Sequence, residues 1–230
     1  MKKLLISALV LLGLAAPAKA QDYLFDNPDN HSYLGARLGF DIMSLRNQSE
    51  IYSNSGGLHM GVVYNMPVWK NLYFEPGVSI FYNRANIKAG NTGTYVVSGN
   101  QIVSGRSNGN ISNWGFRIPL NIGFHFDITD NVRIAPFTGP VINVNFSSKT
   151  NYEFDNPENP SLNYNSLDLG WDFGVGVTYQ RYYLAVEGTA GLTKYVKNDP
   201  YSILVDGGKG GTYYLGGRRN LFTITLGYNF

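Results

Sequence analysis

The sequence predicts an all-β fold: an eight-stranded antiparallel transmembrane up-and-down β-barrel with short periplasmic turns and four long extracellular loops. The first observation is that every second residue from Phe222 to Phe230 is apolar and the residues between them are small or polar, which is the period of a strand with one apolar face. The second is that seven earlier stretches alternate in the same way. The third is a secretion signal at the N-terminus. Together they favour a barrel that closes in a bacterial outer membrane.

The N-terminus has the three parts of a cleaved signal peptide. Met1 is followed by two lysines, an apolar run occupies residues 4–16, and Ala18-Lys19-Ala20 precedes Gln21. We therefore expect cleavage between Ala20 and Gln21. A retained membrane anchor is the alternative, but the apolar run is short for a transmembrane helix. The predicted organisation is a signal peptide at 1–20, a short periplasmic segment at 21–31 and one barrel domain at 32–230.

The charge and cysteine content narrow the function classes. The 18 Lys and Arg side chains include three in residues 1–20, so the secreted chain keeps 15 against 16 Asp and Glu. Such a balance indicates no nucleic-acid partner. The chain has no cysteine, which excludes thiol catalysis, a lipid-modified cysteine and disulfides. A closed hydrogen-bonded barrel would hold such a chain together without them.

The eight alternating stretches are, in chain order, 33–43, 57–67, 72–86, 112–126, 131–145, 167–179, 182–193 and 221–230. Their apolar faces carry, in the same order, Leu38 and Phe40, Met60 and Val62, Ile80 and Tyr82, Trp114 and Phe116, Ile142 and Val144, Trp171 and Phe173, Leu184 and Val186, and Phe222 and Ile224. The opposite faces are polar or small. Each stretch is long enough for the ~9–11 residues that a tilted strand needs to cross a membrane.

The connections alternate between short and long. Segments 68–71, 127–130 and 180–181 read as tight turns, whereas 44–56, 87–111, 146–166 and 194–218 are long and rich in Gly, Asn, Ser and Tyr. Short turns face the periplasm in outer-membrane barrels, and an even strand number then puts both termini there. Within two long loops, 94–103 and 202–215 each read as a hairpin.

A soluble lipocalin-like barrel with its apolar face turned inward is the alternative. It would have to pack Trp114, Phe116, Trp171 and Phe173 into a lumen barely wide enough for side chains. The glycine-rich polar face fits a narrow interior better. Four prolines within the strands, Pro76, Pro119, Pro136 and Pro140, each remove a ladder hydrogen bond, and we interpret them as β-bulges.

Six charged side chains fall on the polar face within the predicted span. They are Arg37, Glu75, Arg117, Arg133, Asp172 and Glu187. In a narrow lumen, opposite charges must pair, so we expect a solid polar core that plugs the barrel. Arg37 and Glu187 lie on either side of the last strand and are predicted to pair. Outward aromatics near strand ends suit the two membrane interfaces; these are Tyr64, Trp114, Phe126, Tyr179, Tyr182 and Phe222.

Catalytic and metal sites have little support in the sequence. Among three histidines, His59 alone sits near the height of the outer rim, with Asp41, Asp168 or Ser79 as candidate partners for a lipid A-modifying enzyme. We expect no catalytic residue, no cofactor and no histidine-based metal site. The motif Phe25–Asn30 recurs as Phe154–Asn159, and its carboxylates leave calcium binding by the loop copy open.

Several short segments resemble the PorT-like outer-membrane β-barrel family of Bacteroidetes. They are 32–40, 72–78, 116–120, 135–140 and 191–193. The resemblance covers nearly the whole secreted chain and implies fold and location, with architecture similar to OmpA- and OmpX-type barrels. One namesake of the family assists type IX secretion. By resemblance, Leu226, Tyr228 and Phe230 supply the terminal pattern that the barrel insertion machinery reads.

Two function classes follow for a non-enzymatic barrel surrounded by outer-membrane lipid and lipopolysaccharide. In the first, the loops serve a surface-binding or structural role through their tyrosines, which are Tyr95, Tyr152, Tyr164, Tyr195, Tyr201, Tyr213 and Tyr214. In the second, the barrel is an accessory component of a secretion or uptake complex and contacts a protein partner through its wall or its periplasmic turns.

Overall fold

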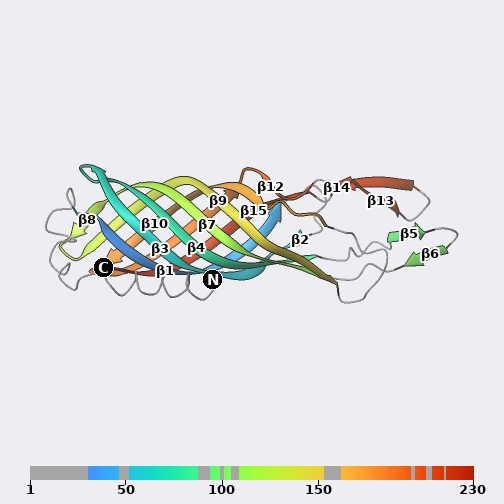
Figure 1. Ribbon diagram of the computed structural model, residues 1–230, viewed down its shortest axis with the longest axis horizontal. Coiled ribbons are helices and arrows are strands. Elements are labelled where there is room, and N and C mark those ends of the chain that lie inside the picture. The colour runs from blue at the N-terminus through green and yellow to red at the C-terminus, as the bar shows by residue number, and fades with distance from the viewer. Residues whose placement is uncertain are drawn as a thin grey trace, which may run out of the picture.

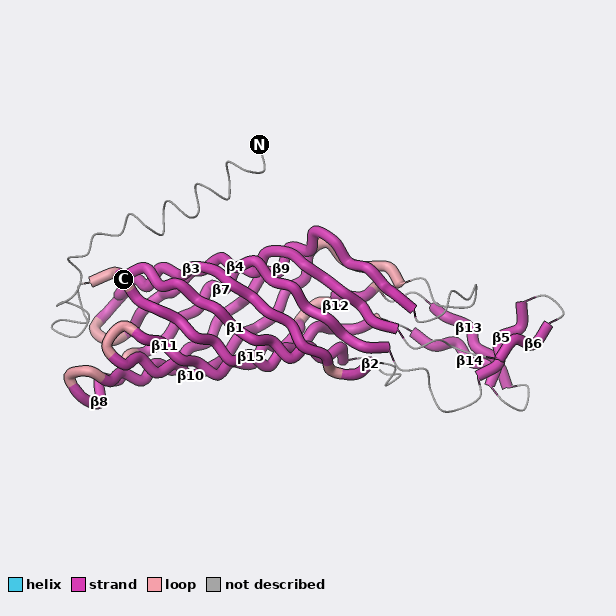
Figure 2. Tube along the Cα trace, turned by 90° about the horizontal axis from the view of Figure 1, so that it is seen from below, coloured by secondary structure: helices cyan, strands magenta, loops and turns pink. Residues whose placement is uncertain are grey.

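The computed structural model describes residues 31–46, 52–87, 94–98, 101–104, 109–152, 162–197, 200–205, 209–214 and 216–230. Strands make up nearly all of the described chain (Figure 2). No helix in these ranges is long and apolar enough to cross a membrane. The signal peptide, the segment 21–30 and both copies of the Asn-Pro motif lie outside the described residues.

Eight strands close into the predicted antiparallel barrel. They are β1 (Tyr33–Arg46), β3 (Ser55–Trp69), β4 (Leu72–Ile87), β7 (Gly109–Phe124), β9 (Val132–Tyr152), β10 (Leu167–Tyr179), β11 (Tyr182–Gly191) and β15 (Gly217–Asn229). Each pairs with the next, and β15 pairs back onto β1, for example Leu38 with Leu226 (Figure 1). Three short strands, β2 (Tyr52–Ser53), β8 (Phe126–Thr129) and β12 (Lys194–Val196), add to the same sheet. The fold class is confirmed.

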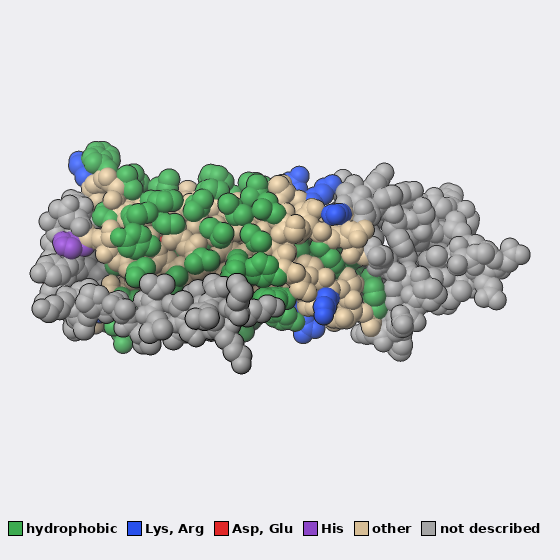
Figure 3. All heavy atoms as spheres, viewed as in Figure 1, with side chains coloured by type: hydrophobic (Ala, Val, Ile, Leu, Met, Phe, Trp, Pro, Cys, Tyr) green, Lys and Arg blue, Asp and Glu red, His purple; other side chains and the backbone are tan. Residues whose placement is uncertain are grey.

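The apolar face of every barrel strand points outward. On β1, Leu38 and Phe40 are 54% and 49% exposed, whereas Arg37 and Asp41 are 7% and 0% exposed. Figure 3 shows the resulting apolar side chains along the face of the barrel wall that is in view. A lipocalin-like barrel would bury these side chains. The structure therefore has the sidedness of a barrel that faces lipid.

Several strands run further toward the loop end than the sequence predicts. β9 extends to Tyr152 instead of residue 145, because its last residues keep pairing with β7 as far as Gly109. The tight turn predicted at 127–130 is present, but it is shorter and lies later, at Asp130 and Asn131. The chain breaks at His125, whose amide donates to Asn71, and then pairs again as β8 before turning at Asp130.

The prediction that four prolines mark bulges is also wrong. The register shifts occur elsewhere, for example where Trp114 pairs with Ser147 and Gly115 with Asn145. Pro119 itself pairs in register with Val141 on β9, whereas it has no partner on β4, and the register is the same on both sides of each gap. The reason is geometric, since the N–H of a strand residue points to one neighbour only. A proline therefore opens one ladder without displacing the register.

The two predicted hairpins are confirmed. β5 (Thr94–Ser98) pairs with β6 (Gln101–Ser104), and β13 (Pro200–Val205) pairs with β14 (Lys209–Tyr214). β5 and β13 also pair with each other, so that two loops distant in sequence share a four-stranded sheet in the order β14-β13-β5-β6. This sheet lies beyond the loop end of the barrel (Figure 1).

Candidate functional site

The lumen is the candidate site, and Asp41 on β1 is at its centre. This carboxylate is fully buried. Arg117 Nη2 donates to its Oδ2 at 3.0 Å, and Thr223 Oγ1 donates to its Oδ1 at 2.7 Å. The Asn83 amide, turned so that its nitrogen faces the carboxylate, lies 2.9 Å from Oδ2. A buried carboxylate with this many donors is fully compensated for the loss of water.

His59 belongs to the same cluster. Its Nδ1 lies 3.1 Å from Asp41 Oδ1, and its ring packs over Gly39, where an added Cβ would be only 2.1 Å from Cε1. Glycine at position 39 therefore makes room for the ring. Of the candidate partners, the structure brings Asp41 to His59, whereas Asp168 pairs with Arg219. His59 is only 7% exposed.

A second layer lies nearer the short-turn end. Arg37 Nη2 lies 3.8 Å from Glu75 Oε2, and Nη1 donates to Asn229 at 2.9 Å. The guanidinium carbon also lies 4.0 Å from the centre of the Tyr183 ring. The predicted pairing of Arg37 with Glu187 is wrong. Strand tilt brings β4 across from β1 at this depth, and Glu187 accepts a hydrogen bond from a hydroxyl instead.

The two remaining acids of the predicted network have neutral partners. Thr225 donates to Glu187 at 2.6 Å, and Thr189 donates to Asp172 at 2.6 Å. Arg133, the last member, bonds Asp127 on β8 at 2.6 Å at the short-turn end. The six residues are thus all inside the barrel or at its rim, but they form separate groups. Two of the acids that were predicted to pair with arginines accept hydrogen bonds from threonines on neighbouring strands instead.

A third polar layer, near the loop end, was not predicted. Arg219 on β15 is 1% exposed, lies 3.1 Å from Asp168 Oδ2 and donates to Asn145 at 2.8 Å. Its guanidinium carbon lies 4.3 Å from the centre of the Tyr195 ring. Arg219 and Asp168 do fall on the inward phase of their strands. Their pairing depends on β15 starting earlier than the alternation indicates.

An apolar cluster closes the lumen beyond this layer. Its buried members are Met43, Leu45, Ala85, Ile87, Ile111, Tyr195, Val196 and Leu221. Tyr52, Tyr152, Leu162 and Tyr164 pack against it. The prediction that Tyr195 is presented to a binding partner is wrong, because this residue is 0% exposed. Burial raises the pKa of the Tyr164 hydroxyl to about 12, so it stays protonated and hydrogen bonds with Thr150.

This apolar cluster, called the apolar cap below, could be predicted from the sequence only in part. On β1, the inward phase changes from Arg37 and Asp41 to Met43 and Leu45, which signals a change of interior beyond the predicted strand end. The side chains of Tyr95, Tyr201, Tyr213 and Tyr214 lie outside the described residues, so their predicted exposure stays a prediction.

A cavity lies within this interior of the described chain. Its volume is about 50 Å³, and its lining includes Arg37, His59, Glu75 and Arg117. A single water needs roughly 10–15 Å³ of such volume, so this space suits a few waters and is too small for a substrate. In the part of the chain that the structure describes, no group of three or more His, Asp or Glu side chains is placed to hold a metal ion.

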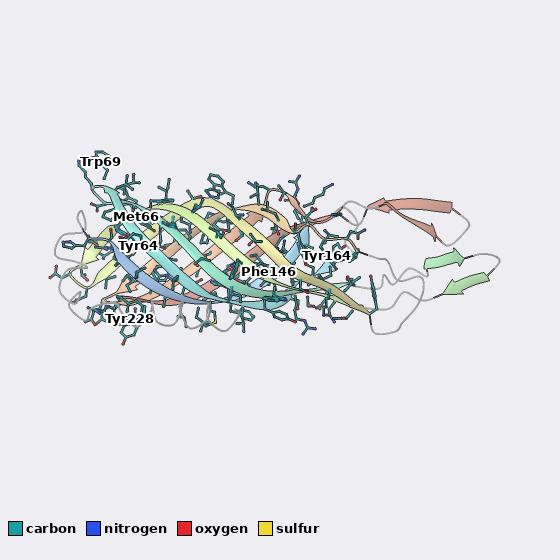
Figure 4. The ribbon with its side chains drawn as sticks, in the orientation of Figure 1. Tyr64, Met66, Trp69, Phe146, Tyr164 and Tyr228 are labelled. Carbon is teal, nitrogen blue, oxygen red and sulfur yellow. The ribbon has the colours of Figure 1, made fainter. Side chains whose placement is uncertain are left out.

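The outer wall carries aromatic side chains at two levels. Tyr64, Trp69 and Tyr228 lie at the short-turn end, and Phe146 lies toward the loop end (Figure 4). All six predicted interfacial aromatics are exposed, from Tyr64 at 42% to Tyr182 at 64%. On the last strand, Leu226 is exposed, and the ring of Tyr228 packs edge-on against the rings of Tyr182 and Phe230. The Phe230 amide donates to Leu34 O at 2.8 Å.

Comparison with known proteins gives a match to one family and to several solved structures. The family is described as "Outer membrane protein beta-barrel domain", and the match covers residues 20–196. No curated protein matches the chain by sequence.

Among solved structures, OprG from Pseudomonas aeruginosa is similar with a TM-score of 0.52 and 10% identity, covering 88% of this chain and 97% of OprG. A major outer membrane protein from Thermus thermophilus has a TM-score of 0.46 and 16% identity, covering 87% of this chain and all of the other. Ail, the attachment invasion locus protein of Yersinia pestis, has a TM-score of 0.35 and 9% identity, with coverage of 87% and 100%. The likeness to OprG supports the fold alone.

Proposed function

Since the chain belongs to the outer-membrane protein β-barrel domain family, we propose that it is a non-enzymatic outer-membrane barrel whose plugged lumen supports a functional surface at the loop end. The signal peptide at 1–20, the periplasmic termini and the terminal insertion pattern are parts of the same proposal. The observation that carries it is the filled interior described above. Three polar layers and an apolar cap leave a cavity of only about 50 Å³.

The interior layers argue for a scaffold. The ion pairs of Arg37, Arg117 and Arg219 each connect two strands that are not neighbours in the barrel, so they brace the wall from inside. His59 is held among these groups instead of facing a space that would admit a lipid substrate. This arrangement supports a structural role for the lumen over lipid A chemistry.

The loop end then provides the surface for binding. Two loops share the four-stranded sheet β14-β13-β5-β6, and paired strands hold a surface in place better than separate loops do. Within the described residues, β14 and β6 form the outer edges of that sheet. The proposed role is display of this sheet at the cell surface, for adhesion or for a structural contact.

The absence of cysteine from the sequence allows a direct test of this orientation. Lys197→Cys places a thiol at the loop end, and Lys70→Cys places one in the turn between β3 and β4; both parent residues are exposed. A membrane-impermeant maleimide should label the first variant on intact cells and the second only after the outer membrane is opened. The reverse pattern would overturn the proposed display.

An accessory role in a secretion or uptake complex is the second candidate. The resemblance to PorT-like barrels supports it, and so does the exposed turn between β3 and β4. Val68 and Trp69 there are 62% and 66% exposed, and an extra residue shifts the register between Pro67 and Trp69. A partner that co-purifies with the wild type in mild detergent, but not with Trp69→Ala, would favour this role. If the partner also co-purifies with the Trp69→Ala variant, the exposed turn no longer supports the accessory role.

A further inference from the structure

Three cationic side chains lie next to one another on the outer wall at the loop end. Arg46 on β1 pairs directly with Arg218 on β15, and Arg218 pairs on its other edge with Lys194 on β12. All three are exposed. Neighbouring strands are about 4.8 Å apart, so the three cationic residues span roughly 10 Å of the wall. We call this set the cationic row.

Within the described residues, no acid compensates the charge of the cationic row. Like charges directly opposite each other destabilise a sheet, yet Arg46 and Arg218 occupy such positions. In the described part of the chain, none of the three forms an ion pair with an acid. An external anion that contacts all three side chains would offset the repulsion between them and would be held by their combined charge.

The position of the row relative to the apolar band identifies the environment of that anion. Arg46 and Arg218 lie on the lipid-facing phase of their strands, two outward positions beyond Ile42 and Phe222, which pair with each other. Figure 3 shows Lys and Arg side chains at the border between the apolar band and the loop end. Anionic headgroups lie at such a border, with their acyl chains alongside the apolar wall.

A second pair of cations lies at the same border on other strands. Arg84 on β4 and Lys149 on β9 both pair with Ser112, which lies between them. The next outward position, about 7 Å along the strand, is occupied by the paired Tyr82 and Trp114. Tyr and Trp are typical of the membrane interface, so the cations lie just beyond it.

Among the described residues, the exposed charges are distributed unequally between the two ends. Among described residues, the exposed acids are Asp127 and Asp130, both at the short-turn end. Within the same ranges, the exposed charged side chains at the loop end are all cationic, namely Arg46, Arg84, Lys149, Lys194, Lys197 and Arg218. In the described part of the barrel, this distribution suits a loop-end leaflet that carries more phosphate than the opposite leaflet.

We propose that the cationic row binds the phosphate groups of an outer-leaflet glycolipid of the lipid A class, with its acyl chains against Ile42 and Phe222. A guanidinium donates two parallel hydrogen bonds to a phosphate, and two adjacent arginines with a lysine offer several such donors. The inference rests on the proposed orientation of the barrel. It deepens that proposal by assigning a specific lipid-binding site.

The test uses the purified full-length secreted chain in nanodiscs and three lipid probes: lipid A, chemically dephosphorylated lipid A and phosphatidylglycerol. Lipid retained by the protein is measured by native mass spectrometry. The wild type should retain lipid A, and retention should fall roughly tenfold or more for the dephosphorylated probe. The triple variant R46Q/R218Q/K194Q should lose lipid A to the same extent, whereas Lys70→Gln at the other end should not.

Unchanged lipid A retention by the triple variant would overturn the site. Equal retention of phosphatidylglycerol would overturn the glycolipid assignment in favour of a general anionic surface. Because the three side chains are exposed, the variant should keep wild-type heat-modifiable migration, which checks that it folds.

Binding in nanodiscs does not depend on orientation in the cell. Failure of the maleimide test with intact lipid A retention would therefore reject the display function alone. Normal orientation without lipid A retention would reject the cationic row alone.

Discussion

Asp41 Oδ2 and Arg117 Nη2 are 3.0 Å apart, although β1 and β7 are separated in the barrel by β3 and β4. The pair therefore spans the lumen instead of linking neighbours in the wall. Nearer the loop end, Asp168 on β10 and Arg219 on β15 are joined past the one strand, β11, that lies between them. Contacts of this kind connect strands that are not neighbours, so their removal should lower the stability of the whole barrel.

Replacing Arg117 should destabilise the barrel. Arg117→Leu leaves the Asp41 carboxylate buried without its cation, which for a buried pair costs about 3–5 kcal/mol of the free energy of unfolding. Urea unfolding of the protein refolded in lipid vesicles measures the loss. Arg84→Gln, which removes an exposed charge, is the matched control and should change stability by less than about 0.5 kcal/mol. Similar stability of the two variants would show that the lumen pair is not structural.

The close packing of His59 on Gly39 predicts a specific rescue. Gly39→Ala would place a Cβ 2.1 Å from His59 Cε1, so the ring must move away from Asp41. Such overpacking costs roughly 1–3 kcal/mol. The double variant Gly39→Ala/His59→Ala should recover part of the loss in the same urea titration. If the double variant is no more stable than Gly39→Ala, the ring is not the source of the strain.

The filled lumen predicts that the barrel does not conduct. Planar-bilayer recordings of the wild type should show no steady open channel, because the layers around Asp41 and Arg219 occupy the interior. A general porin, inserted under the same conditions, provides the positive control. A stable conductance of porin size would replace the scaffold with a transport function.

Closure of the barrel predicts heat-modifiable migration. The eight strands leave no open edge, since β15 pairs with β1 over twelve residue pairs from Gly35–Asn229 to Arg46–Arg218. Such a barrel resists SDS until it is boiled. Unboiled and boiled samples should therefore run differently, and the protein should fractionate with the outer membrane. Identical migration with a soluble periplasmic location would contradict the membrane assignment.

Deleting Phe230 should impair insertion more than it alters the finished barrel. Its ring packs edge-on against Tyr228, and its amide is bonded to Leu34 O, so it adds little to the interior. We expect periplasmic accumulation and proteolysis of the truncated chain, whereas Phe230→Trp should reach the membrane. Quantitative blotting of membrane fractions distinguishes the two. Normal outer-membrane levels of the deletion variant would limit Phe230 to an interfacial packing role.

The sequence by itself determined the strand number, the closed antiparallel order and which face of each strand meets lipid. These properties follow from local alternation, which a strand converts into two faces whatever its partners. The hairpins at 94–103 and 202–215 followed from the same pattern. The inward position of Arg37, Glu75, Arg117, Asp172 and Glu187 was determined in this way too.

Only the tertiary structure decided which of those side chains meet. Arg37 pairs with Glu75 and not Glu187, and Asp41 with Arg117, because strand tilt and stagger set which residues share a depth in the lumen. The apolar cap around Tyr195 and Met43 likewise depends on tertiary structure, because β12, which carries Tyr195, pairs with β15. The cationic row arises the same way, since Arg46, Lys194 and Arg218 come together through the register of β1, β12 and β15. Alternation along one strand carries no information about register between strands.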